Sequence, residues 1–171
     1  MDDVIKGHIR DIPDFPKPGI IFRDITPLLA NGEAFHGVVD RIAERFRGRI
    51  DMVLGIESRG FIIGAPVAYA LHSGLAVVRK PGKLPSLTFA AQYALEYGTD
   101  ALEIHRDAFG HPCRVLIVDD LLATGGTARA AVELVERLGG EVVAGAFVIE
   151  LTGLKGRERL QPHAVMSLVQ Y

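Results

Sequence analysis

The sequence predicts an α/β fold: a mostly parallel, twisted sheet with helices on both faces. Short apolar runs rich in β-branched residues recur along the chain, and such runs are typical of strands buried in a parallel sheet. Amphipathic stretches of helical period separate them. Because strands that alternate with helices pair in parallel and are covered on both sides, these observations together predict the fold class.

Length and composition predict one globular domain over residues 1–171, with 49% hydrophobic and 23% charged residues. The formal net charge of -2 argues against a general binder of nucleic acid or membrane surfaces, which would need a basic surface. Cys113 is the only cysteine, which excludes an intrachain disulfide and fits a reducing compartment. The first residues lack signal-peptide features, and no apolar run approaches the roughly 20 residues that cross a bilayer. We therefore expect a cytoplasmic protein that binds neither nucleic acid nor membrane.

The N-terminal region is expected to begin with a short helix over residues 4–12. Closely spaced prolines between Pro13 and Pro18 then force extended and turn conformations, and a short strand follows at residues 20–25. One interpretation is a stiff surface loop that packs its isoleucines on the core. The other is a fixed wall for a flat ligand, on which Phe22 would stack.

The first complete helix is predicted from a cap at Asn31 to about Phe46, since apolar residues recur there on one stripe. Residues 51–56 form the first core strand, which leads into a tight turn at residues 57–60. Arg59 in that turn could simply pair with a surface carboxylate. A guanidinium at the carboxyl end of a strand is equally suited to a diphosphate, because it is bidentate and always charged.

The next helix is expected to begin within residues 61–66, since Pro66 is tolerated only in a first turn or at a kink. A short strand follows at residues 75–78. Residues 80–104 are then the least core-like part of the chain, and we expect them to form a mobile lid. A weak hairpin over residues 86–98 is one arrangement of the lid, and a helix over residues 89–95 is the alternative.

The central strand is predicted at residues 114–118, and two adjacent carboxylates, Asp119 and Asp120, follow at its carboxyl end, where ligands bind in open α/β sheets. The turn at residues 124–127 then opens a helix over residues 126–138, so that backbone amides converge at a helix N-terminus that favours an anion. Such turns are common without phosphate. Two side-by-side carboxylates, however, repel each other and need a hydroxyl-rich or metal-bound partner. The stretch therefore predicts a ribose 5-phosphate site.

Two further strands are predicted at residues 141–149 and 164–169, with a turn or single helical turn over residues 154–160 between them. The sequence contains neither a P-loop nor a G-x-G-x-x-G motif after a strand, and its histidines show no metal-ligand spacing. No serine or cysteine lies in a nucleophile elbow, so covalent catalysis has no candidate residue.

Several blocks of the sequence resemble the type I phosphoribosyltransferases, and within that family the members that act on adenine. The signature at residues 118–127 is typical of the whole family. The blocks at residues 15–27 and 95–98 are typical of the adenine-specific members. The remaining matching blocks are residues 58–61, 79–85 and 150–151.

This resemblance implies a type I phosphoribosyltransferase fold with a small N-terminal hood over residues 1–30 and a lid loop over residues 80–104. The implied reaction joins adenine to 5-phosphoribosyl 1-diphosphate, giving AMP and diphosphate in purine salvage. Mg²⁺ is the implied cofactor, held mainly through substrate and water with no direct protein ligand, and the implied assembly is a homodimer. Three alternatives remain: an enzyme for another 6-substituted purine, a ligand-sensing regulator, and a non-catalytic binding module.

The resemblance also assigns roles to residues. Backbone groups near Ile21 and Arg23 would read adenine, and Phe22 and Leu121 would sandwich its ring. Glu96 in the lid would manage the proton lost from adenine; the alternative is a solvent-facing glutamate. The other implied ligand residues are Ala123, Thr124, Gly125, Gly126 and Thr127 for the 5-phosphate, Asp119 and Asp120 for ribose, and Glu57, Ser58, Arg59, Arg79, Lys80 and Lys83 for diphosphate.

Two details of the resemblance concern the diphosphate residues. Arg79 is the one that the family tends to supply from a partner subunit. The family often carries Asp at the position of Glu57. Because the backbone of that turn does the binding, the change is expected to leave the activity intact.

Overall fold

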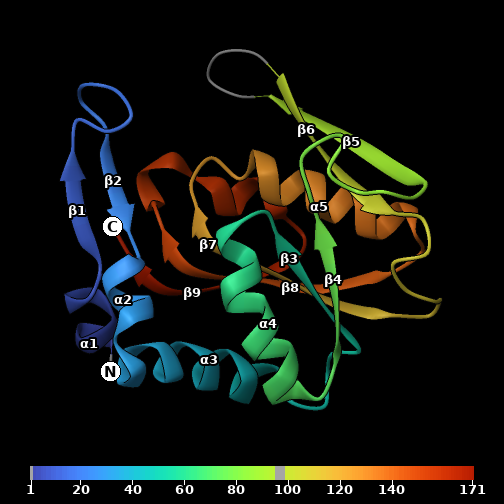
Figure 1. Ribbon diagram of the computed structural model, residues 1–171, viewed down its shortest axis with the longest axis horizontal. Helices are drawn as coiled ribbons and strands as arrows, with labels where there is room; N and C mark the ends of the chain where they lie inside the picture. The colour runs from blue at the N-terminus through green and yellow to red at the C-terminus, as the bar shows by residue number, and fades with distance from the viewer. Residues whose placement is uncertain (1, 95–98) are drawn as a thin grey trace.

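Five parallel strands form the central sheet of the computed structural model, which describes residues 2–94 and 99–171 (Figure 1). Their order is β4–β3–β7–β8–β9, and every neighbouring pair is parallel. The predicted fold class is therefore confirmed. The strands are β3 (Met52–Ile56), β4 (Gly74–Val78), β7 (Arg114–Leu122), β8 (Glu141–Glu150) and β9 (Ala164–Gln170).

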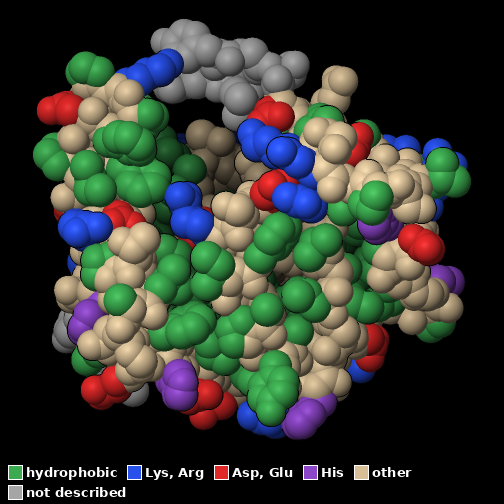
Figure 2. All heavy atoms as spheres, in the orientation of Figure 1, with side chains coloured by type: hydrophobic (Ala, Val, Ile, Leu, Met, Phe, Trp, Pro, Cys, Tyr) green, Lys and Arg blue, Asp and Glu red, His purple; other side chains and the backbone are tan. Residues whose placement is uncertain are grey.

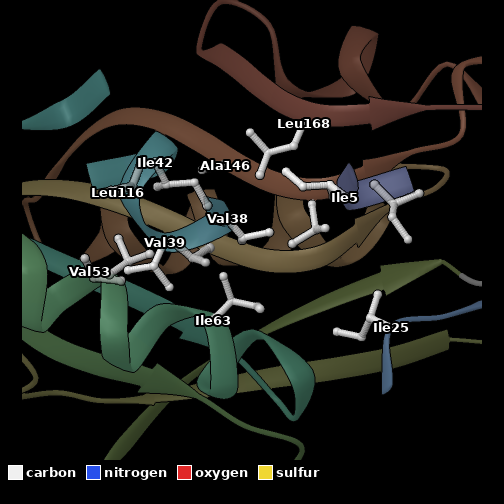
Figure 3. Close-up of a cluster of buried hydrophobic side chains, with 14 of the residues drawn as sticks. Ile5, Ile25, Val38, Val39, Ile42, Val53, Ile63, Leu116, Ala146 and Leu168 are labelled. Carbon is white, nitrogen blue, oxygen red and sulfur yellow. The ribbon is translucent and has the colours of Figure 1, made fainter. Parts of the chain in front are cut away.

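Helices cover both faces of the sheet. On one face lie α3 (Gly32–Phe46) and α4 (Arg59–Leu71), and on the other lies α5 (Gly126–Arg137) (Figure 1). The alternation of side chains along β7 supplies both sides: Leu116 joins the cluster under α3 and α4, and Ile117 joins the cluster under α5. Figure 3 shows the first cluster, in which side chains of the helices and of the sheet interdigitate. No described helix is long and apolar enough to cross a membrane.

The start of α3 agrees with the sequence prediction, whereas the start of α4 does not. The predicted cap of α3 is confirmed, because the Asn31 side chain accepts a hydrogen bond from the backbone N–H of Ala34 at 2.9 Å. The predicted start of α4 within residues 61–66 is wrong, since the helix begins at Arg59 and carries Pro66 inside it. Proline leaves the carbonyl group four residues earlier without its helical partner. That residue is Ile62, and the packing of α4 against β3 and β7 offsets the loss of one helical hydrogen bond.

The N-terminal region contains α1 (Asp2–Gly7), β1 (Arg10–Pro13), β2 (Ile21–Asp24) and α2 (Thr26–Ala30). The predicted helix over residues 4–12 is thus wrong in its second half, because β1 pairs antiparallel with β2 and so gains its hydrogen bonds there. Helix α2, which has a proline in its first turn, was not predicted from the sequence. Ile5 and Ile25 anchor this region in the same buried cluster as Leu168 of β9 (Figure 3).

The segment after β4 forms an antiparallel hairpin of β5 (Thr88–Ala94) and β6 (Thr99–His105). A hairpin is therefore present, but its second strand, β6, begins after the predicted limit at residue 98; the alternative helix over residues 89–95 is wrong, because β5 extends to Ala94. Ala91 and Leu102 are buried in the cluster under α5, so the hairpin is more core-like than its sequence predicts. The connection between β8 and β9 has two short 3₁₀ helices, η1 (Thr152–Leu154) and η2 (Gly156–Leu160), in place of the predicted single turn.

Candidate active site

A cavity of about 390 Å³ lies at the carboxyl ends of β3 and β7. Figure 2 shows the molecule hollowed on this side, between the N-terminal region and the hairpin. The cavity lies where the strands of an open α/β sheet present their ends to ligands. The lining residues are Glu57, Ser58, Arg59, Lys80, Tyr93, Asp119, Asp120, Leu121, Leu122, Ala123, Thr124, Gly125, Gly126, Thr127 and Ala128.

The predicted phosphate turn, residues 123–127, forms one wall of the cavity. Gly125 has a φ of +81°, a conformation that glycine adopts without strain, and α5 begins at the next residue. No side chain of the described residues caps α5 at this position. The first backbone N–H groups of α5 are therefore available to an anion, and the helix dipole favours negative charge there.

The acidic pair lies within β7, not after it as the sequence predicts. Strand β7 continues to Leu122, since it keeps its pairing with β8 as far as Glu150. Asp120 is only 4% exposed and pairs with the guanidinium of Arg59. The backbone N–H of Asp120 donates to Oδ1 of Asp119 at 2.9 Å. Burial, together with the neighbouring Asp120 carboxylate, raises the pKa of Asp119 well above its usual range.

The side chain of Arg59 pairs with a carboxylate inside the cavity. Its Nε donates to Oδ2 of Asp120, which is a buried carboxylate at the sheet edge, not one on the surface. The side chain remains 41% exposed, and its guanidinium lies 5.2 Å from the centre of the Phe22 ring. Arg59 therefore faces the cavity with donors that a diphosphate could use.

The basic segment that follows β4 contacts Glu57 in the turn after β3. Oε1 of Glu57 accepts a hydrogen bond from Nη2 of Arg79 at 2.8 Å, and Oε2 accepts one from the backbone N–H of Lys80 at 2.8 Å. The hydrogen bond from Arg79 holds the pKa of Glu57 below its usual range. The peptide bond between Glu57 and Ser58 is cis. Of the predicted diphosphate residues, Arg79 and Lys83 lie outside the cavity lining, and the others are part of it.

One residue of the hairpin lines the cavity and a second contacts two of the lining residues, and both were missed from the sequence. Tyr93 lines the cavity, and its hydroxyl donates to Oδ2 of Asp100 at 3.2 Å. Asp100 pairs with the ammonium group of Lys80, which lowers the pKa of Asp100 and raises that of Lys80. Tyr93 and Asp100 are register partners across the hairpin, so a strand pairing assigned to the sequence could have placed them together.

The predicted adenine wall is only partly joined to this cavity. Leu121 lines the cavity, whereas Ile21, Phe22 and Arg23 of β2 do not. Phe22 is half-buried and touches the site through Arg59. The side chain of Arg23 points elsewhere, pairing with Asp11 and lying 3.8 Å from the centre of the Tyr171 ring. Glu96, the predicted proton acceptor, lies outside the described residues.

The phosphoribosyl transferase domain family matches residues 28–169 of the chain. The chain is 61% identical to the adenine phosphoribosyltransferase of Chloroflexus aurantiacus over 95% of each chain, and 56% identical to that of Syntrophotalea carbinolica over the full length of both. Among solved structures, the adenine phosphoribosyltransferase of Thermoanaerobacter pseudethanolicus is 50% identical, with a TM-score of 0.97 over all of both chains.

The enzyme from Saccharomyces cerevisiae, solved in complex with an imino-altritol bisphosphate and adenine, is 42% identical. Its TM-score is 0.93 over 98% of each chain. In these four comparisons the similarity extends over almost the whole length of both chains.

Proposed function

This chain belongs to the phosphoribosyl transferase family and, within it, to the adenine phosphoribosyltransferases, and we propose that it joins adenine to 5-phosphoribosyl 1-diphosphate, giving AMP and diphosphate. The observation that carries the proposal is the shared cavity. The phosphate turn, the acidic pair and Arg59 all open into it. One ligand that contains a phosphate, a sugar diol and a diphosphate could meet all three at once.

The phosphate turn and the acidic pair would hold the sugar. Backbone N–H groups of residues 123–127 would bind the 5-phosphate, with the hydroxyls of Thr124 and Thr127 as further donors. The carboxylates of Asp119 and Asp120 would accept hydrogen bonds from the ribose hydroxyls. In the transfer, the bond between C1 of ribose and the diphosphate oxygen breaks, and a bond from C1 to N9 of adenine forms.

The leaving diphosphate gains negative charge in this step, and the cations around the cavity would stabilise it. Each of these cations is held by a carboxylate in the structure: Arg59 by Asp120, Arg79 by Glu57, and Lys80 by Asp100. Such pairs keep the cations in place before the ligand arrives. A diphosphate could then bind the same cations, beside the carboxylates or in their place, without moving the cations.

Mg²⁺ belongs to the same proposal, as an ion carried on the substrate. The described residues include no group of three or more His, Cys, Asp or Glu side chains that could hold a metal ion. The carboxylates of Asp120 and Glu57 are engaged by arginines. This arrangement favours an ion that would arrive with the substrate, since Mg²⁺ usually keeps several waters and binds substrate phosphates rather than a cage made only of protein groups. When bound, the ion would neutralise charge on the diphosphate.

Adenine would stack between Phe22 and Leu121, with backbone groups of Ile21 and Arg23 reading its edge. Arg59 supports this placement, because its guanidinium bridges Asp120 in the cavity and the ring of Phe22 beside it. The hood over residues 1–30 and the lid over residues 80–104 would cover the site from two sides. Excluding water would limit hydrolysis of the donor.

Comparing turnover of adenine, hypoxanthine and guanine with 5-phosphoribosyl 1-diphosphate tests the proposal directly. We expect AMP formation from adenine with Mg²⁺ present, little reaction with the two oxopurines, and loss of activity when the ion is chelated. A preference for an oxopurine would favour the enzyme for another purine. Binding of the donor without AMP formation would favour the non-catalytic module.

Replacing Glu96 with glutamine should mainly lower kcat and change KM only modestly. Glutamine keeps the size of the side chain but cannot accept the proton that adenine loses from N9 as the new bond forms. Steady-state kinetics with both substrates would measure the effect. Glu133→Gln on the exposed side of α5 is a matched control, because Glu133 is a surface glutamate outside the cavity lining. An unchanged rate for Glu96→Gln would favour the alternative, a solvent-facing glutamate with no role in catalysis.

A homodimer and a cytoplasmic location complete the proposal. The outer side of α4 and the edge strand β4 expose Ile62, Tyr69 and Leu75, and Figure 2 shows a broad apolar area on this face. Tyr69→Asp should therefore shift the chain to a monomer in light scattering. Leu154→Asp, at another exposed apolar residue, should leave the assembly unchanged. A Tyr69→Asp variant that stays dimeric would place the interface elsewhere.

A further inference from the structure

The turn at Gly156 lies directly against the loop that we assign to the 5-phosphate. A Cβ atom at Gly156 would overlap the carbonyl oxygen of Ala123 and would lie 3.0 Å from the amide nitrogen of Gly125. In the reverse direction, a Cβ atom at Gly125 would lie 2.5 Å from the carbonyl oxygen of Gly156. The two backbones therefore touch with no room for a side chain between them.

Arg157, the next residue, ties this turn to the sheet. Its Nε donates to Oε1 of Glu150 at 3.0 Å, and its Nη2 donates to Oε2 at 2.6 Å. Its Nη1 donates to the carbonyl oxygen of Val165 at 2.8 Å. This bidentate geometry fixes the direction of the guanidinium as well as its charge. The turn is thereby fastened to β8 and β9 together.

Glu150, the partner of Arg157, also lies beside the start of the phosphate loop. It is 3% exposed, and it also accepts a hydrogen bond from the Ser167 hydroxyl at 2.6 Å. The hydrogen bond from Arg157 lowers the pKa of Glu150, which keeps the carboxyl group ionised. In the sheet, Glu150 is the register partner of Leu122, the residue immediately before the loop. The ion pair therefore supports the loop at its start, through Leu122, and along its backbone, through Gly156.

We propose that Gly156, Arg157 and Glu150 are positioning residues that hold the backbone of residues 123–127 in the shape that receives the 5-phosphate. The inference rests on the proposed function, because it assumes that this loop binds the phosphate of the donor. Arg157 is not among the residues that line the cavity, and Glu150 and Val165 occupy its guanidinium. Its effect on the reaction is therefore exerted through the loop, not on the substrate.

The test compares Gly156→Ala with Gly153→Ala. A methyl group at Gly156 cannot fit unless this turn and the loop at residues 123–125 move apart, whereas a Cβ atom at Gly153, in the same connection, meets nothing within 4 Å. Since a displacement of about 1 Å can cost roughly 10²-fold, we expect the KM for 5-phosphoribosyl 1-diphosphate to rise by roughly 10- to 100-fold in Gly156→Ala. The KM for adenine should stay near that of the wild type, and Gly153→Ala should leave both unchanged. A Gly156→Ala variant with the wild-type KM for the donor, or with both KM values raised equally, would overturn the proposal.

If Gly156→Ala does not fold, Arg157→Lys and Arg157→Met carry the same test. Lysine keeps the charge but lacks the bidentate fork, so Arg157→Lys should raise the KM for the donor less than Arg157→Met does. Folded variants that both keep the wild-type KM for the donor would contradict a positioning role.

Calorimetry with ribose 5-phosphate separates this inference from the proposed function. This probe contains the 5-phosphate but neither adenine nor diphosphate. If the wild-type chain binds ribose 5-phosphate but forms no AMP from adenine and 5-phosphoribosyl 1-diphosphate, only the proposed function is contradicted. Gly156→Ala should still weaken the binding of ribose 5-phosphate in that case. A wild-type chain that does not bind ribose 5-phosphate would overturn the positioning proposal itself.

Discussion

Replacing Asp119 with asparagine should lower kcat/KM for 5-phosphoribosyl 1-diphosphate. The expected loss of transition-state stabilisation is about 2–3 kcal/mol, as for hydrogen bonds to charged groups. At about 1.4 kcal/mol per factor of ten, this loss corresponds to roughly 30- to 150-fold. The physical reason is that a carboxylate accepts hydrogen bonds from both ribose hydroxyls, whereas an amide presents one oxygen and one donor group. Steady-state kinetics at saturating adenine would measure the loss. Wild-type kinetics in this variant would mean that the assignment to the ribose diol is wrong.

The same variant should be at least as stable as the wild type at neutral pH. The pKa of Asp119 is raised well above its ordinary value of 3.8 by burial and by the Asp120 carboxylate. The folded state thus holds this proton more tightly than the unfolded state does. The resulting stability is fully present below the unfolded-state pKa and is lost as the pH rises through the folded-state pKa.

Asparagine does not ionise, so Asp119→Asn should escape this loss. Urea unfolding across this pH window should show the wild type losing stability relative to the variant as the pH rises. Asp120→Asn is the informative contrast, because Asp120 is buried and pairs with Arg59. That change should lower both activity and stability. Equal destabilisation by both changes at neutral pH would contradict the difference between the two acids.

Gly60→Ala should impair both folding and catalysis, whereas Gly64→Ala, one turn later on α4, should be tolerated. A Cβ atom at Gly60 would lie 2.7 Å from the carbonyl oxygen of Val118 and 3.0 Å from Oδ1 of Asp119. The helix would have to move away from β7, and overpacking of this kind costs about 1–3 kcal/mol. The shift would also displace Arg59 from the cavity, where about 1 Å can cost roughly 10²-fold in rate.

Gly64 provides the matched control, since the nearest atom to its added Cβ would be 3.5 Å away, which is ordinary contact. Alanine there should leave activity unchanged and stabilise the helix by about 0.5–1 kcal/mol. Urea unfolding and steady-state kinetics of both variants would check these expectations. Equal behaviour of the two would show that α4 does not need its close approach to β7 at Gly60.

Much of the fold could be predicted from the sequence because hydrophobic period is a local property. The helix capped by Asn31 and the strands of the sheet follow from periods that a short window contains. The errors arose where tertiary contacts outweighed local preference. Residues 10–13 pair with β2 instead of continuing a helix, and Pro66 lies inside α4 because the packing of this helix on β3 and β7 outweighs the one hydrogen bond that proline removes.

The site was predicted unevenly for the same reason. The glycine turn that opens α5 was predicted correctly, because a glycine at positive φ and a helix N-terminus are features of adjacent residues. Tyr93 and Asp100 were missed, because their role depends on the strand pairing of the hairpin and on its position beside Lys80. Gly156 was missed as well, since the residues around it in the sequence do not indicate that it touches the loop at Gly125.

By itself, the sequence determined the fold class, the family resemblance and the glycine turn that opens α5, because each depends on residues that are neighbours along the chain. Only the tertiary structure decided which carboxylate each cation meets. Arg59 and Asp120 are 61 residues apart, and the parallel pairing of β3 with β7 brings them to one edge of the sheet. A periodic pattern records which face a side chain occupies. It does not record its partner across the sheet, which depends on strand order and register.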